Sequence, residues 1–209
     1  NLIIGTTTLS RVNLENLIGI PSEEKSNKER TKKFNLKLSN YPIDTSIAFI
    51  KLIDKLNLSK ENAYKFLKNK STTEHRFEKV EIINGTRFIN DSKSTNFHSV
   101  SSASERVKNA LLIMHGITKN IPTSELQLSN EIKKIIIPND MNLDHNLFHC
   151  EVEVVKSIFE LEDILKKDFQ RFETVLFSCG GSSFNDFENY IERGKFFKSI
   201  VKNLKGGQN

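Results

Sequence analysis

The sequence predicts an α/β fold, with a mostly parallel sheet covered by helices on both faces and a helical segment ahead of it. Two observations lead to this prediction. From residue 75 onward, short apolar runs alternate with stretches in which apolar residues recur every three or four positions. Such alternation is typical of strands joined by amphipathic crossover helices. Residues 43–68 instead show the pattern of two consecutive helices, so we expect residues 71–74 to be a linker.

Two helices are the first elements that the pattern predicts. Residues 43–57 carry one apolar stripe, formed by Ile43, Ile47, Ile50, Ile53 and Leu56. Such a stripe is the face that an amphipathic helix buries. Ser59 then caps a second helix over 60–68, because a short side-chain oxygen accepts from the free N–H groups of a first turn. Residues 2–4 predict a strand, and because the chain begins at Asn1 beside it, we expect a fragment of a longer protein.

The second part of the chain predicts a Rossmann-like order of strands and helices. Strands are expected at 78–84, 87–90, 110–115, 133–137, 151–155 and 174–179. Helices are expected at 96–107, 123–131, 158–168 and 185–203, the third with a capping box of Ser157 and Glu160. Ligands of parallel sheets bind beyond the carboxyl ends of the strands. The turns after residues 90, 115 and 179 are such ends, so we expect them to converge.

Charge and composition narrow the class of protein. The 209 residues carry a net charge of +5 and give a pI of about 9.1, a balance that can indicate nucleic-acid binding. The lysines are spread among glutamates without an aromatic-rich basic stripe, which favours a solvated surface instead. Cys150 and Cys179 match no zinc or redox spacing and suit a reducing cytosol. No apolar run approaches a membrane span, so we expect a cytoplasmic protein without nucleic-acid or membrane partners.

The polar turn at residues 91–96 is the best candidate for a binding site. It follows the apolar end of a strand and precedes the helical spacing of Phe97, Val100, Ala103 and Val107. Lys93 beside a helix N-terminus makes a good site for an anion, because the free N–H groups there carry partial positive charge. Asp91 in the same turn is able to hold a metal ion or a hydroxyl group. The ordinary alternative is a capped βα turn that binds nothing.

Three motifs in this chain resemble those of one enzyme family. Asp91-Ser92-Lys93-Ser94-Thr95-Asn96 resembles the "D-S-K-[AS]-T-N" motif of the D-glutamate-adding branch of the Mur ligase family. His75-Arg76-Phe77-Glu78, followed by Ile83-Asn84-Gly85, resembles the motif that precedes it there. Ser183 to Gly194 resembles "S-x-D-x-F-x-x-F-x-x-R-G" near the end of those enzymes. Three motifs in the right order are far more specific than one, and the resemblance covers roughly residues 36–204.

The resemblance implies a place in a larger enzyme. Residues 1–70 would be the end of the central, ATP-hydrolysing domain, and residues 71–209 the carboxyl-terminal, amino-acid-binding domain. The family joins D-glutamate to UDP-N-acetylmuramoyl-L-alanine during peptidoglycan precursor synthesis, through an acyl phosphate, with ATP and magnesium. Magnesium would be bound mainly by parts of the enzyme outside this chain. The resemblance thus implies a monomeric ligase whose isolated fragment is inactive.

The same resemblance implies roles for individual residues. Residues expected to bind the substrates D-glutamate and the acyl end of the nucleotide are Lys93, Thr95, Lys119, Ser183, Phe184 and Tyr190. Residues expected to face ATP are His75, Arg76 and Asp91, with Arg76 toward the phosphates and Asp91 toward the ribose or base. The ordinary alternatives are a solvated lysine, a glycine-rich turn with Phe184 and Tyr190 in the core, and an interdomain hinge. No residue of the chain is expected to be catalytic or to bind a metal ion.

Two departures from the family pattern keep a second function open. The family motif "G-x-H-N-x-x-N-A" contacts adenine, but the matching stretch, residues 39–46, has neither the histidine nor the asparagines. Of "G-G-x-x-K", only Gly116 and Lys119 remain. We therefore expect the chain alone to bind ATP feebly. The alternative function is a non-catalytic, Mur-ligase-like binding or regulatory module.

Overall fold

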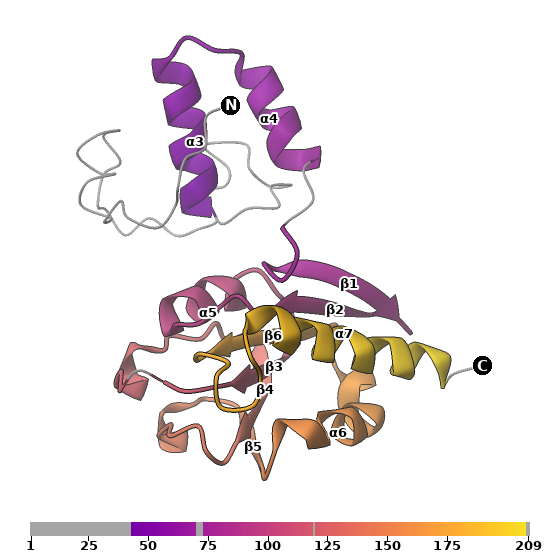
Figure 1. The fold of residues 1–209 in the computed structure, drawn as a ribbon. Helices are drawn as coiled ribbons and strands as arrows, with labels where there is room; N and C mark the ends of the chain where they lie inside the picture. The colour runs from indigo at the N-terminus through magenta and orange to yellow at the C-terminus, as the bar shows by residue number, and fades with distance from the viewer. Residues whose placement is uncertain (1–42, 70–72, 119, 208–209) are drawn as a thin grey trace. The chain divides into compact units, whose positions relative to one another are not determined.

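The computed structural model describes residues 43–69, 73–118 and 120–207 (Figure 1). The chain divides into two units between Ser71 and Thr72, and each unit is described by itself. The strand expected at residues 2–4, residues 39–42 of the adenine-motif stretch and Lys119 lie outside the described residues. The assignment of the two units to domains of a larger ligase stays a prediction.

A pair of helices forms the described part of the first unit. Helix α3 covers Ile43–Lys55 and α4 covers Lys60–Asn69. They pack through a small apolar core of Ile47, Ile50, Ala63 and Leu67. The Ser59 hydroxyl accepts from the Asn62 N–H at 3.3 Å, as expected of a cap. Both predicted helices are therefore present, with the first ending two residues earlier than expected.

The second unit is built on a six-stranded sheet with strand order β1-β2-β6-β3-β4-β5. The strands are β1 Glu78–Ile83, β2 Thr86–Asp91, β3 Ala110–His115, β4 Ile132–Pro138, β5 Glu151–Val155 and β6 Thr174–Gly180. Only the β1–β2 pair is antiparallel within this sheet. Its hairpin turns at Asn84 and Gly85, both with positive φ, as a two-residue primed turn requires. The mostly parallel sheet is confirmed.

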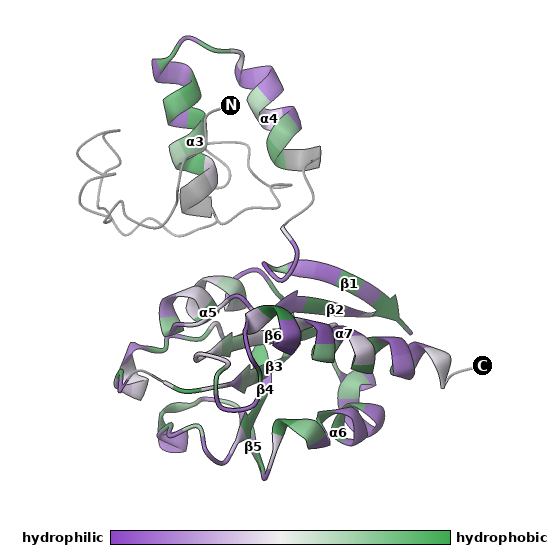
Figure 2. Cartoon of the chain, viewed as in Figure 1, coloured by the Kyte–Doolittle hydropathy of each residue, from purple (hydrophilic) through white to green (hydrophobic). Residues whose placement is uncertain are grey.

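Helices cover both faces of this sheet. Helix α5, Phe97–Ser104, packs on the face reached by Leu112 and Met114. Helices α6, Leu161–Asp168, and α7, Tyr190–Gly206, pack on the other face, reached by Leu111 and Ile113. Successive strand residues point to opposite faces, so one apolar strand serves both cores. Figure 2 shows hydrophilic and hydrophobic residues mixed along the outer strand β1. Its charged residues, Glu78, Lys79 and Glu81, suit a sheet edge.

The prediction of a helix at residues 123–131 is wrong. The chain makes one 3₁₀ turn there, Thr123–Glu125, and then runs irregularly to β4. The Gln127 N–H donates to the Ser101 hydroxyl at 3.1 Å, and the Ser129 N–H donates to the Ser104 hydroxyl at 3.0 Å. Side chains of α5 thus satisfy backbone donors that a helix would have paired internally.

Two other predicted helices begin later than expected. The helix predicted from residue 185 begins at Tyr190, because the Asn189 side chain accepts from the Ile191 and Glu192 N–H groups and starts it there. The helix predicted from residue 158 is preceded by a 3₁₀ turn, and the Ser157 hydroxyl accepts from Phe159 instead of forming the capping box. Further 3₁₀ turns cover His145–Leu147 and Phe169–Arg171.

Hydropathy and cysteines complete the description of the chain. In the part of the chain that the structure describes, no helix is both long and apolar enough to cross a membrane. Cys179 is buried in β6 and Cys150 is half-buried, and both are free thiols.

Candidate functional site

Three turns meet at the carboxyl edge of the sheet. Strands β2, β6 and β3 are neighbours, so the turns that follow them lie side by side. The Gly180 N–H donates to the Ser94 carbonyl at 2.9 Å, which joins the turns after β6 and β2. Ile117 and Ser182 exchange two backbone hydrogen bonds, at 2.9 and 3.0 Å, which join the turns after β3 and β6. The convergence predicted for these turns is present.

Asp91 is a buried carboxylate that holds the first turn together. One oxygen accepts from the Phe77 N–H at 2.9 Å, and the other accepts from the hydroxyls of Ser94 at 2.5 Å and Ser178 at 2.8 Å. Burial raises the pKa of Asp91, while the three hydrogen bonds oppose that rise. The carboxylate therefore connects the segment before β1, the turn after β2 and strand β6. Its predicted contact with ATP stays a prediction.

His75 is buried and fixes the entry into the second unit. Its carbonyl accepts from the Lys93 N–H at 3.0 Å, and its ring Nδ1 lies 2.9 Å from the Asn90 amide nitrogen. Gly194 of α7 approaches the ring so closely that a Cβ there would lie 2.2 Å from Nδ1. Only glycine fits this contact. The Asn90 amide nitrogen can only donate, so Nδ1 of His75 accepts from it. Burial lowers the pKa of His75, which favours this neutral form of the ring.

Arg76 stands between two residues with unusual backbone conformations. His75 and Phe77 have φ values of 63° and 48°, a region that residues other than glycine enter rarely. His75 is buried and Phe77 is half-buried, whereas Arg76 is exposed. The guanidinium carbon of Arg106 lies 3.6 Å from the centre of the Phe77 ring. The anchored neighbours thus direct Arg76 away from the core.

Lys93 and Tyr190 are in direct contact. The Lys93 ammonium lies 3.5 Å from the centre of the Tyr190 ring, a favourable cation–π arrangement. Tyr190 is the first residue of α7, and its carbonyl accepts from the Ser92 hydroxyl at 2.8 Å. Among the described residues, no carboxylate forms an ion pair with Lys93. The charge is therefore held at the start of a helix, with no ion pair to a carboxylate in the described part of the chain.

Of the remaining predicted substrate residues, Thr95, Ser183 and Phe184 lie on or near the same turns. Ser183 is buried, and its carbonyl accepts from the Asp186 and Phe187 N–H groups at 3.3 and 2.9 Å. Thr95 is half-buried, directly before the cap Asn96 of α5. The Phe184 side chain is 73% exposed, so the alternative that places it in the core is wrong.

Arg193 is the functional residue that sequence reasoning missed. It is fully buried and donates to the Ser92 hydroxyl and carbonyl at 3.1 and 2.8 Å. Its Nη1 donates to the carbonyls of His115 and Gly181 at 3.1 and 3.0 Å. One guanidinium therefore bonds to all three turns. The sequence feature that could have pointed to Arg193 is its place in the third motif, directly before Gly194.

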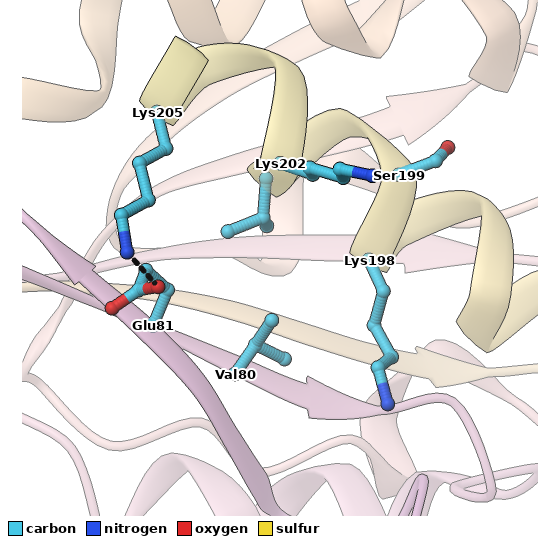
Figure 3. Close-up of a pocket in the computed structure, with 7 residues that line it drawn as sticks. Val80, Glu81, Lys198, Ser199, Lys202 and Lys205 are labelled. Carbon is cyan, nitrogen blue, oxygen red and sulfur yellow. Dashed lines mark hydrogen bonds and ion pairs between the residues drawn. The ribbon is translucent and has the colours of Figure 1, made fainter.

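Two hollows in the surface of this unit lie apart from the Lys93–Tyr190 contact. The first lies between β1 and α7 and is lined by Val80, Glu81, Lys198, Ser199, Val201, Lys202 and Lys205 (Figure 3). Lys205 pairs with Glu81 at 2.7 Å, and Lys198 bonds to Glu74 and Glu78. Much of the positive charge that lines this hollow is therefore compensated by glutamates. The second lies beside the first turn of α5. No group of three or more His, Cys, Asp or Glu among the described residues is placed to hold a metal ion.

Comparison with known proteins decides the family. No protein-family model matches the chain. The UDP-N-acetylmuramoylalanine–D-glutamate ligase of Thermosipho africanus is 35% identical over 148 residues, which cover 68% of this chain and 35% of the relative. The enzyme of the same name from Thermosipho melanesiensis is 36% identical over 152 residues, covering 70% and 36%. The chain belongs to the Mur ligase family. The resemblance seen in the sequence is confirmed.

A solved structure shows that this Mur ligase chain also shares the family fold. The UDP-N-acetylmuramate-alanine ligase MurC of Thermotoga maritima superposes with a TM-score of 0.50 at 15% identity, covering 80% of this chain and 39% of that one. The Mur ligase chain spans about a third of the length of the two curated relatives described above. Its first motif, Asp91–Asn96, lies on the turn after β2, and its third, Ser183–Gly194, covers the turn after β6 and the start of α7. The second motif lies before β1 and in the β1–β2 hairpin.

Proposed function

We propose that this chain is the D-glutamate-binding part of an ATP-dependent ligase that joins D-glutamate to UDP-N-acetylmuramoyl-L-alanine in peptidoglycan precursor synthesis. One observation carries the proposal: the Lys93 ammonium, without an acidic partner among the described residues, lies over Tyr190 at the first turn of α7. A fixed cation at a helix N-terminus suits a carboxylate ligand. The names of the curated relatives point to D-glutamate as that ligand.

Two carboxylates of D-glutamate need partners if the ligand is to leave water. Burying a charge is unfavourable unless it is paired and hydrogen-bonded. Lys93 would bind one carboxylate, with the Thr95 hydroxyl nearby in sequence. The Ser183 hydroxyl would bind the other, with Lys119, which follows β3 in the sequence, as a second candidate. The N–H groups of Gly180 and Ser182 already donate to the Ser94 and Ile117 carbonyls. The rigid joining of the turns would keep the two partners at a constant separation, which favours one length of dicarboxylate.

The residues before β1 fit the ATP side of such a reaction. Arg76 is exposed between two anchored neighbours, so its guanidinium is free of the core and suits a phosphate group. Asp91 already accepts three hydrogen bonds within the chain, and we assign it chiefly to holding the turn. Magnesium, when bound, would neutralise phosphate charge. His75 would act by anchoring the Arg76 and Lys93 segments to each other.

The chain would contribute orientation to the reaction. In the proposed reaction ATP transfers its γ-phosphoryl group to the carboxylate of UDP-N-acetylmuramoyl-L-alanine, which forms an acyl phosphate and releases ADP. The D-glutamate amine attacks that carbonyl carbon, loses a proton and expels phosphate. A site that clamps both carboxylates leaves the amine as the free end of D-glutamate and directs it at the acyl carbon. The isolated chain should bind without catalysing, because the remaining substrates would be held by other parts of the enzyme.

A ligase assay of the full-length protein tests this proposal. Phosphate release is measured with ATP, UDP-N-acetylmuramoyl-L-alanine and one of three amino acids: D-glutamate, L-glutamate or D-aspartate. We expect phosphate release to depend on D-glutamate. L-Glutamate, its mirror image, and D-aspartate, the shorter dicarboxylate, should give much slower release. Saturable D-glutamate binding without phosphate release would favour the non-catalytic binding module. Absence of both binding and release would contradict the proposal.

A further inference from the structure

His115 lies at the carboxyl end of β3 and is fully buried, with a partner at each ring nitrogen. Nε2 lies 2.8 Å from the Asp186 carboxylate, and Nδ1 lies 3.2 Å from Nη1 of Arg193. A guanidinium can only donate and a carboxylate only accepts. Nδ1 therefore accepts from Arg193, and Nε2 carries the hydrogen and donates to Asp186. The neutral ring in this one tautomer satisfies both partners.

Both contacts lead to the turn that carries Ser183. The N–H groups of Asp186 and Phe187 donate to the Ser183 carbonyl, so the Asp186 side chain is attached to the same small hydrogen-bonded loop. The Phe187 ring also packs edge-on against His115, with ring centres 5.5 Å apart and planes at 74°. Arg193 reaches the beginning of the turn through the Gly181 carbonyl. His115 thus supports the 181–187 turn from inside the sheet.

We propose that His115 is a positioning residue for the D-glutamate site: its neutral ring, hydrogen-bonded to Asp186 and Arg193, holds the 181–187 turn and thereby places Ser183. This inference rests on the proposed function for the ligand. The hold on the turn can be measured without any ligand. Neither His115 nor Asp186 was singled out by the sequence motifs as a binding residue.

The charges around the ring make this support dependent on pH. Facing His115 are the carboxylate of Asp186, the buried guanidinium of Arg193 and, at longer range, Asp140 of the turn after β4. Burial lowers the pKa of His115, Arg193 lowers it further, and the Asp186 hydrogen bond opposes both. Protonation would remove the acceptor at Nδ1 and set a cation 3.2 Å from Arg193. The turn is therefore held at neutral pH and loosens as the pH falls through this lowered pKa.

Two variants of the full-length protein separate the contacts. His115→Phe fills the ring volume without a hydrogen bond, whereas the amide of His115→Gln can still donate to Asp186. His98→Phe is the matched control, because His98 is exposed on α5. At pH 8 we expect His115→Phe to raise the KM for D-glutamate about tenfold, the effect of about 1.4 kcal/mol, and to leave the KM for ATP unchanged. His115→Gln should recover most of the loss, and His98→Phe should behave as the wild type.

Hydrogen exchange of the 183–187 backbone, without substrates, provides the second measurement. We expect exchange there to accelerate about tenfold in His115→Phe. Faster exchange in a protein whose wild type shows no D-glutamate dependence would refute the proposed ligand, while the hold of His115 on the turn would stand. Unchanged exchange, or an equal rise in the KM for D-glutamate and ATP, would overturn the inference.

Discussion

The Arg193 guanidinium donates to the Ser92 carbonyl at 2.8 Å, although 101 residues of chain separate the two. Ser92 belongs to the turn after β2, and Arg193 lies in the first turn of α7. A second hydrogen bond, from Arg193 Nε to the Ser92 hydroxyl, makes the contact bidentate. A planar, permanently charged group with five donors is suited to joining several carbonyl groups at once. The site around Lys93 depends on this internal contact.

Arg193→Lys should destabilise the second unit, because an ammonium cannot reach acceptors in three turns. We expect the free energy of unfolding to fall by about 3 kcal/mol, since buried carbonyls would lose their donors. Urea unfolding measures the change. Lys195→Ala is the matched control two residues along α7, where an exposed lysine pairs only with Glu192 among the described residues. A loss no larger than that of the control would show that Arg193 is dispensable for folding.

Lys93→Ala should weaken D-glutamate use selectively. We expect the KM for D-glutamate to rise by about tenfold to a hundredfold, because a hydrogen bond to a charged group contributes about 1.5–3 kcal/mol. The KM for ATP should change little. Tyr190→Phe keeps the ring beneath the ammonium and should resemble the wild type, whereas Tyr190→Leu should show part of the Lys93→Ala effect. Steady-state kinetics of the full-length protein decide the matter, and an equal rise for both substrates would mark Lys93 as structural.

Gly194→Ala should destabilise the protein although alanine favours helices. The new methyl group would lie 2.2 Å from the His75 ring, and forcing it in should cost about 2 kcal/mol overall. Gly206→Ala is a control in the same helix, because nothing lies within 4 Å of a Cβ at that position. It should stabilise by about 0.5 kcal/mol. Thermal melting of both variants gives the comparison, and matching shifts would contradict the close contact with His75.

Stability should fall as the pH drops below about 6.5, the ordinary pKa of histidine. Burial lowers the pKa of both His75 and His115 in the folded state. Below pH 6.5 the unfolded chain therefore binds more protons than the folded one, and stability is lost until the folded pKa values are passed. Urea unfolding at several pH values between 7.5 and 5 measures this loss.

The His115→Gln variant isolates one histidine in the same experiment. Asp91 contributes a slope of opposite sign, because burial raises its pKa in the folded state. The difference between wild type and His115→Gln removes that contribution. We expect the variant to lose less stability than the wild type over this pH range. An identical pH dependence would mean that His115 keeps its ordinary pKa.

Local sequence patterns predicted the strands and most helices of the second unit correctly, but not where some of the helices begin. Apolar runs such as Ala110–His115 predicted strands, because a strand buried on both faces must be apolar throughout. The stretch 123–131 has apolar residues but forms no α-helix, since its N–H groups bond to Ser101 and Ser104 of α5. Those acceptors lie 25 and 26 residues away, beyond the reach of any local pattern.

The sequence by itself determined the parallel sheet, the edge at which the motifs meet and the family to which they belong. Alternating strands and helices leave few topologies, and the carboxyl ends of parallel strands share one edge. Only the tertiary structure decided that Lys93 lies on Tyr190, that Asp91 is an internal carboxylate and that Arg193 and His115 support the turns. His115 and Asp186 are 71 residues apart along the chain, and Arg193 and Ser92 are 101 residues apart. Folding alone brings such groups within hydrogen-bond distance. Burial then strengthens each hydrogen bond, because the protein interior has a lower dielectric constant than water.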